Sequence, residues 1–303
     1  MPIVTANGLS LAFDSFGEGS AGTCLLISGL GTQMIRWTEP FCHLLAADGF
    51  RVIRFDNRDA GLSTHLSDEP APDFAALAAD LREGRRPRVP YSLRDMARDA
   101  VGLLDALSIG CAHVLGRSMG GMIAQIIAAD DPDRVASLTS IMSGTGNPAL
   151  PGPAPDVWAM MTRPAPDPRT DEAAYLERGL AFARRIAGTG GPFDADGRRA
   201  LLAEEARRAW DPAGTARQIA AIAVTGDLRP DLARIRAPAL ILHGTDDPLI
   251  PPASGRDSAA SIPGARLVLI DGMGHDLPPW LDGRIAGEIL GHARVARASG
   301  RTA

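Results

Sequence analysis

Short apolar runs alternate with amphipathic stretches along most of the chain. Leu9–Phe16 comes close to strict alternation of apolar and polar residues, which is typical of a half-buried strand. Further short runs predict buried strands at Thr23–Ser28, Arg51–Phe55, Ala112–Leu115, Val135–Met142, Ala239–His243 and Leu267–Ile270. Between them, helical spacing marks Arg36–Ala47, the stretch from Ser92 to Leu107, the segment from Met119, and Leu281–Arg294. Strands that alternate with helices predict an α/β fold: a mostly parallel sheet with helices on both faces.

One long stretch breaks this alternation. Residues 144–230 are rich in Pro, Gly, Ala and Arg and have amphipathic helical patterns but no clear strand. A stretch of this length is too long to be a loop inside a compact domain. We therefore predict an α/β core of residues 1–143 and 231–296, a helical cap inserted at 144–230, and a disordered tail at 297–303.

A candidate nucleophile lies between a predicted strand and a predicted helix. Gly116-Arg117-Ser118-Met119-Gly120 fits the pattern G-x-S-x-G, which is weak alone because glycine is frequent in this chain. The context strengthens it, since a sharp strand-to-helix turn strains the serine and exposes its hydroxyl group. Small residues two positions before and after then avoid a steric clash. The alternative is a glycine-rich turn with a passive serine.

A serine hydroxyl needs a base within hydrogen-bond reach. His275 lies in a loop just after the strand predicted at Leu267–Ile270, and the carboxyl ends of parallel strands share the edge where ligands bind. We therefore predict that His275 faces Ser118. Among the other histidines, His65 also lies in a loop near that edge and remains the alternative base.

The acid that orients the base should follow another strand at the same edge. Asp246 and Asp247 lie in the loop Gly244–Pro248, which follows the strand predicted at Ala239–His243. We choose Asp247 and keep Asp246 as the alternative; the carboxylate that is not used would be solvated. The resulting order Ser, Asp, His is the one expected of an α/β-hydrolase fold.

Two main-chain N–H groups should stabilise the oxyanion of an acyl-transfer intermediate. Met119, the residue after the nucleophile, is the first candidate. Leu30, between Gly29 and Gly31 in the loop after Thr23–Ser28, is the second. The alternative for Leu30 is a plain glycine turn.

Composition excludes several other chemistries. All 31 basic residues are arginine, so Schiff-base enzymes, P-loop nucleotide binders and Ser–Lys dyads, which need lysine, do not fit. The net charge of −5 argues against a nucleic-acid partner. The N-terminus has no signal-peptide pattern and no run of about 18 apolar residues occurs, so we expect a cytoplasmic protein without a membrane segment.

At this point the chain resembles the α/β-hydrolase family. The matching motifs are Leu25–Gly29, Asp56–Ser63, Gly116–Gly121, Gly244-x-x-Asp247-x-x-x-Pro251 and Gly274-His275. The resemblance implies the fold and a Ser118–Asp247–His275 triad, and its register favours Asp247 over Asp246. Ser28 stands where the family often has histidine.

Within this family the chain resembles the group of aclacinomycin methylesterase and related bacterial carboxylesterases. Asp56–Ser63, Gly188–Asp194 and Gly272–His275 carry that similarity. It implies hydrolysis of a carboxylic ester or a lactone of a bulky apolar molecule, with no cofactor and no metal. The alternatives are an acyltransferase, a perhydrolase or a C–C hydrolase with the same triad, and a non-catalytic receptor on the same fold.

Candidate substrate contacts lie in two places. In the cap, Trp158 and Met161 belong to a short Trp–Met cluster that suits an apolar group, and Met34 and Trp37 after the oxyanion loop are candidates for the opposite wall. The alternative is that these side chains only pack the cap onto the core. The cap arginines, including Arg163, could attract an anionic substrate, although such residues are more often a solvated helix face. The expected partner is a small-molecule ester, and the expected oligomer is a monomer or a homodimer.

Overall fold

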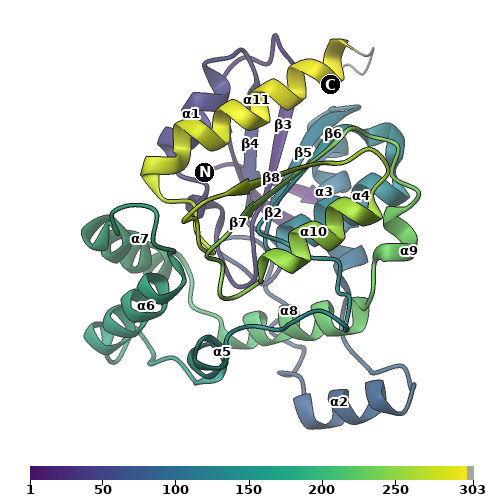
Figure 1. The fold of residues 1–303 in the computed structure, drawn as a ribbon. Helices are drawn as coiled ribbons and strands as arrows, with labels where there is room; N and C mark the ends of the chain where they lie inside the picture. Colours follow the sequence, from purple (N-terminus) through teal and green to yellow (C-terminus); the bar gives the residue numbers. More distant parts are fainter. Residues whose placement is uncertain (299–303) are drawn as a thin grey trace.

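A single mixed sheet forms the centre of the computed structural model, which describes residues 1–298 (Figure 1). Its strand order is β1-β2-β4-β3-β5-β6-β7-β8. The strands are β1 (Ile3–Ala6), β2 (Leu9–Phe16), β3 (Thr23–Ile27), β4 (Arg51–Phe55), β5 (Ala112–Arg117), β6 (Val135–Ile141), β7 (Ala239–Gly244) and β8 (Arg266–Ile270).

Strand direction brings the predicted site residues to one edge. β1 and β2 pair antiparallel, as do β2 and β4, whereas every pairing from β4 through β3 to β8 is parallel. The carboxyl ends of β3, β5, β7 and β8 therefore lie at the same edge, where ligands bind in open α/β sheets. The loops that follow these strands contain Leu30, Ser118, Asp247 and His275 in turn.

Helices cover both faces of the sheet (Figure 1). α1 and α11 pack together on one face, and α3, α4 and α10 cover the other. The α-helices are α1 (Glu39–Ala46), α2 (Phe74–Arg82), α3 (Leu93–Ala106), α4 (Met119–Asp130), α5 (Pro155–Thr162), α6 (Glu172–Ile186), α7 (Ala195–Arg208), α8 (Pro212–Thr225), α9 (Arg229–Leu232), α10 (Pro252–Ser261) and α11 (Asp282–Ala298). Short 3₁₀ helices occur at Met34–Arg36, Pro132–Arg134 and Pro279–Leu281.

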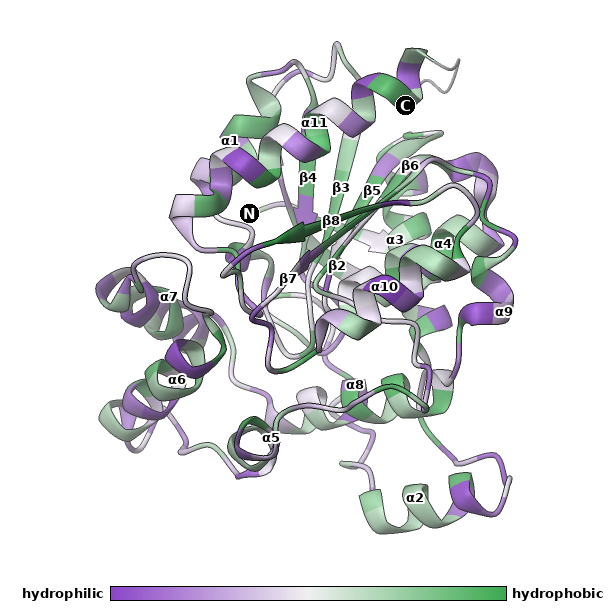
Figure 2. Ribbon diagram, in the orientation of Figure 1, coloured by the Kyte–Doolittle hydropathy of each residue, from purple (hydrophilic) through white to green (hydrophobic). Residues whose placement is uncertain are grey.

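The central strands have buried apolar side chains on both faces. β3, β5, β6 and β7 are buried along their whole length, and two separate apolar clusters form, one beneath α3 and α4 and one beneath α1 and α11. In Figure 2 the strands are accordingly mostly green, while α7 is mostly purple. This two-sided burial makes the sheet a rigid base for the loops at its edge.

Residues 144–230, called the cap segment below, contain α5 to α8 and no strand. α5, α6 and α7 lie apart from the sheet, and α8 runs between them and α3 (Figure 1). Leu176, Leu180 and Leu202 form a small apolar cluster between α6 and α7. The boundary predicted at residue 230 falls inside α9.

The structure differs from the sequence-based elements in four places. β1 and α2 were not expected. The helix predicted at Arg36–Ala47 begins at Glu39, because the Thr38 side chain accepts a hydrogen bond from Phe41 N and Pro40 follows at the first turn. α11 continues to Ala298, so the predicted tail begins inside a helix. Residues 299–303 of that tail lie outside the described residues.

Among residues 1–298, none of the helices combines the length and the apolar character that crossing a membrane requires.

Candidate active site

Ser118 occupies a strained turn between β5 and α4. Its φ of 54° and ψ of −124° lie outside the regions that residues with a side chain favour. The turn requires small neighbours: a Cβ atom on Gly116 would lie 2.0 Å from Gly120 O, and one on Gly120 would lie 2.2 Å from Ile27 O. The local sequence therefore folds as the G-x-S-x-G motif predicts.

A continuous hydrogen-bond chain joins the three predicted triad residues. His275 Nε2 lies 3.0 Å from Ser118 Oγ, and His275 Nδ1 lies 2.7 Å from Asp247 Oδ2. Because a carboxylate can only accept, Nδ1 carries the proton and Nε2 is free to accept the serine proton. His275 and Asp247 are both buried. This geometry suits a nucleophile, a base and an acid that orients the base.

The second oxygen of Asp247 is also fixed. Asp247 Oδ1 accepts hydrogen bonds from the main-chain N–H groups of Leu249 and Ile250, at 2.9 and 2.8 Å. His243 Nε2 lies 3.6 Å from Asp247 Oδ2, but it is hydrogen-bonded to Ile250 O at 2.8 Å. Burial lowers the pKa of His243, which favours a neutral ring beside the triad.

Asp246 contacts a different partner. Its Oδ2 accepts hydrogen bonds from the main-chain N–H and the hydroxyl group of Thr189 in the cap segment. Nearby, His275 N donates to Ile186 O at 2.6 Å and Gly274 N donates to Ala187 O at 3.1 Å. The loop that carries His275 is thus hydrogen-bonded to the end of α6, so the cap segment helps to position the predicted base.

The loop from Ser28 to Gly31 lies against the serine. A Cβ atom on Gly29 would be 3.1 Å from Ser118 Cβ, and Gly31 N donates to Gln218 Oε1 of α8 at 2.8 Å. Asn57 Nδ2 donates to Ser28 O, whereas the buried Ser28 hydroxyl has no hydrogen-bond partner among the described residues. Leu30 and Met119 line the same cavity as Ser118, and the first N–H groups of a helix have no partner within it.

A cavity of about 650 Å³ opens at Ser118 and His275 between the sheet edge and the cap segment. Much of its wall is apolar, with contributions from α5, α6, α7 and α8. These apolar residues include Leu150, Met160, Met161, Phe182, Ile186, Leu202, Ile219 and Ile222. Only Met161 among the four predicted substrate contacts belongs to this wall.

The other three predicted contacts lie elsewhere, so that part of the prediction was wrong. Met34 and Trp37 are fully buried and neither lines the cavity; Trp37 belongs to the apolar cluster beneath α1 and α11. Trp158 is 52% exposed on α5 and does not line the cavity either. The cap arginine Arg163 is also absent from the wall. Sequence spacing gave no signal for the wall residues of α6 to α8, which meet only in the folded chain.

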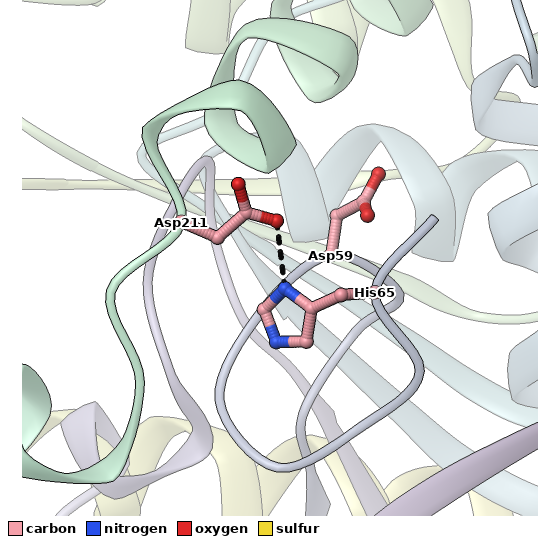
Figure 3. Close-up of side chains that lie close together, drawn as sticks. All are labelled: Asp59, His65 and Asp211. Atoms are coloured by element: carbon pink, nitrogen blue, oxygen red, sulfur yellow. Dashed lines mark hydrogen bonds and ion pairs between the residues drawn. The ribbon is translucent and has the colours of Figure 1, made fainter. Parts of the chain in front are cut away.

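His65, the alternative base, belongs to a separate network. Its Nδ1 is 2.7 Å from Asp211 Oδ2 (Figure 3). Its Nε2 is 2.9 Å from Gly61 O. Ligand atoms of Asp59, His65 and Asp211 lie within 4.8 Å of one another. Arg217 already donates to both oxygens of Asp59 and to Asp211, so a cationic side chain already lies between these two carboxylates. We interpret the cluster as an ion-pair network that holds α8 to the core.

The two hydrogen bonds of His65 predict pH-dependent stability. Burial alone would lower the pKa of His65, but Gly61 O, Asp211 and Asp59 together raise it above its ordinary value. A raised pKa in the folded state stabilises the protein fully below the unfolded pKa of about 6.5, and this contribution disappears as the pH rises through the folded pKa. His65→Gln should therefore lower the free energy of unfolding by about 1 kcal/mol at acidic pH and by less at alkaline pH.

Urea unfolding of the native protein and of His65→Gln, each at an acidic and an alkaline pH, measures this difference in the free energy of unfolding. His43→Gln, which changes an exposed histidine of α1, is the control. A loss that grows with rising pH would contradict the prediction.

The chain that forms this site is similar to known proteins over most of its length. The family model described as alpha/beta hydrolase fold matches residues 23–280. The chain belongs to the α/β-hydrolase family. Its relatives include the rhodomycin D methylesterase DauP of Streptomyces sp. (strain C5), which is 33% identical over 97% of this chain and 98% of that protein.

Two further similar proteins extend the comparison. The poly(3-hydroxyalkanoate) depolymerase of Ectopseudomonas oleovorans is 32% identical over 66% of this chain and 68% of its own length. The solved structure of the enol-lactonase from Burkholderia xenovorans LB400 superposes with a TM-score of 0.70 and 26% identity, over 96% of this chain and 99% of that chain. The sequence-based prediction of the family and of the fold is confirmed.

Proposed function

We propose that this protein is a serine-dependent carboxylic ester hydrolase that acts through an acyl-enzyme on Ser118. The hydrogen-bond chain from Ser118 through His275 to Asp247, at the floor of a mostly apolar cavity, carries this proposal. The names of the relatives support an ester as the substrate, since they include a methylesterase and an enol-lactonase. The size of the cavity and its largely apolar wall favour a bulky ester or lactone that is apolar over most of its surface.

The proposed mechanism has two steps. Ser118 Oγ attacks the ester carbonyl while His275 Nε2 takes its proton, and the tetrahedral oxyanion accepts hydrogen bonds from Leu30 N and Met119 N. His275 then gives that proton to the leaving alcohol, and the C–O bond of the ester breaks. In the second step His275 activates water, which attacks the acyl-enzyme, and the acid leaves as Ser118 regains its proton.

We further propose that residues 144–230 act as a cap on a core of residues 1–143 and 231–296. Walls from α5 to α8 close the cavity over Ser118, and the end of α6 fixes the main chain of His275. A cap of this kind shields the bound ester from bulk solvent, still admits the water that deacylates Ser118, and helps to position His275.

Hydrolysis of p-nitrophenyl esters of graded acyl length tests the function. We expect turnover with kcat/KM of about 10⁴ M⁻¹s⁻¹ or higher for the best ester, with a rise and fall along the series that reflects the size of the cavity. Methyl esters of aromatic acids form a second series. p-Nitrophenyl phosphate is the control for unspecific cleavage. Folded protein that hydrolyses no ester or lactone would refute the proposed function.

A further inference from the structure

One corner of the cavity is strongly charged. Arg36, Arg117 and Arg198, called the arginine corner below, line the cavity together with Asp276. They come from distant parts of the chain: the 3₁₀ helix after β3, the end of β5, and α7 of the cap segment. Leu115 and Arg117 share one face of β5, because side chains alternate along a strand, and this face is the one covered by α1 and α11.

Two of the three arginines have a carboxylate partner at hydrogen-bond distance. Arg36 Nε and Nη2 each donate to a different oxygen of Glu205, both at 2.7 Å. Arg198 Nη2 forms an ion pair with Asp276 Oδ2. Although burial opposes it, Arg198 and Arg117 lower the pKa of Asp276, so this carboxylate is ionised. Both pairs join α7 to the core.

Arg117 is left without a close counter-charge among the described residues. The nearest carboxylate oxygen, Asp276 Oδ1, is 4.0 Å from Arg117 Nη2. Arg117 Nη1 donates to the main-chain carbonyl oxygen of Arg36 at 3.1 Å, and this acceptor carries no charge. The Trp37 ring beneath it, 5.8 Å from the guanidinium carbon, adds only a cation–π contact. Arg117 is only 5% exposed, and the corner as a whole holds three cations against two carboxylates.

A buried cation without a close partner is costly. Burial, together with Arg36 and Arg198, lowers the pKa of Arg117 to about 10, which still leaves it protonated at neutral pH. An anion in the cavity would supply the missing charge, and a guanidinium group binds a carboxylate through two parallel hydrogen bonds.

We propose that the arginine corner binds a carboxylate of the substrate, so that the preferred substrates are half-esters that carry a free carboxylate beside the scissile ester. This inference rests on the proposed function, since Ser118 would attack the ester of the same molecule. The geometry suits a half-ester because Arg117 directly precedes Ser118 and Asp276 directly follows His275. All four residues line one cavity. The carboxylate and the ester of one molecule can thus be held together.

Matched pairs of esters test this specificity. The monomethyl and dimethyl esters of succinic, glutaric, adipic and pimelic acid differ in one charge and little else. We expect kcat/KM for the monomethyl ester to exceed that for the dimethyl ester by about ten- to a hundredfold at the best chain length. An equal or lower kcat/KM for the monomethyl ester at every length would overturn the inference, while hydrolysis itself would leave the proposed function standing.

Variants of Arg117 test whether the arginine corner causes the preference for the monomethyl ester. Arg117→Gln should bring the ratio of the two kcat/KM values close to one, mainly through KM for the monomethyl ester, and Arg117→Lys should keep part of it. Arg207→Gln removes the same charge from an exposed position of α7 and should leave the ratio at its native value. A ratio that stays at its native value in Arg117→Gln would overturn the inference.

A binding measurement distinguishes the proposed anion site from the proposed ester hydrolysis. It uses the native protein, so it needs no folded variant. In calorimetric titrations of the native protein, adipate should bind and adipamide, its neutral analogue, should not. Equal binding of both compounds, or of neither, would overturn the anion site. A protein that binds adipate but hydrolyses no ester would instead contradict the proposed function.

Discussion

Ser118→Ala is expected to lower kcat for ester hydrolysis by about 10⁶-fold. The substitution removes the oxygen that His275 Nε2 contacts at 3.0 Å, so no acyl-enzyme can form. The remaining donors of the cavity would still bind the ester and leave a residual rate about 10³- to 10⁴-fold above that in water. Initial rates with p-nitrophenyl butyrate measure the loss, and mass spectrometry should find an acyl adduct on the native protein alone.

A second serine of the same cavity provides the control. Ser254 lines the cavity, and its hydrogen bonds within the described residues go to Pro251 and Ser258 rather than to the triad, so Ser254→Ala should change kcat only slightly. Ser118→Ala should remain folded, because alanine fits the φ of 54° at position 118 no worse than serine does, and Ser254→Ala places a good helix former in α10. Turnover that survived in Ser118→Ala would exclude this residue as the nucleophile.

The sheet and the hydrogen-bonded trio could be predicted from the sequence because both depend on local signals. Buried parallel strands appear as short apolar runs, and the residues after them must meet at one edge. Ser118 directly follows such a run, and Asp247 and His275 lie in the loops that follow two others. The choice between Asp246 and Asp247 was harder, since adjacent residues of a loop differ only in where the fold turns them: Asp246 contacts Thr189 and Asp247 contacts His275.

The cavity wall was less predictable, since it depends on contacts between distant segments. Trp37 looked like a substrate contact because it follows the oxyanion loop, but α1 turns it into the core, where it packs against Phe41. The arginines of the cavity were only partly predictable. Cap arginines were candidates, and Arg198 of the cap does line the cavity whereas Arg163 does not; the structure adds Arg36 and Arg117 from the core. No periodicity links these three positions, so only the folded chain reveals their common location.

Asp247→Asn should lower kcat by about 10⁴-fold at neutral pH, and the surroundings of Asp247 explain the size of this loss. Oδ1 accepts from two main-chain N–H groups, those of Leu249 and Ile250, so the amide oxygen of asparagine would occupy that position. Its NH₂ group would then face His275 Nδ1 and donate to it. The proton of the imidazole would move to Nε2, which could no longer accept the proton of Ser118.

Asp246→Asn is the matched control, since it makes the same chemical change one residue earlier. Asp246 contacts Thr189 and not His275, so its loss should weaken the attachment of the cap segment and change kcat by much less than Asp247→Asn does. Steady-state kinetics on one p-nitrophenyl ester compare the two variants. A larger fall in kcat for Asp246→Asn would assign the acid to Asp246. We expect the larger fall in kcat for Asp247→Asn, because hydrogen bonds fix both oxygens of Asp247. In the asparagine variant these bonds allow only one orientation of the amide, with its NH₂ group toward His275.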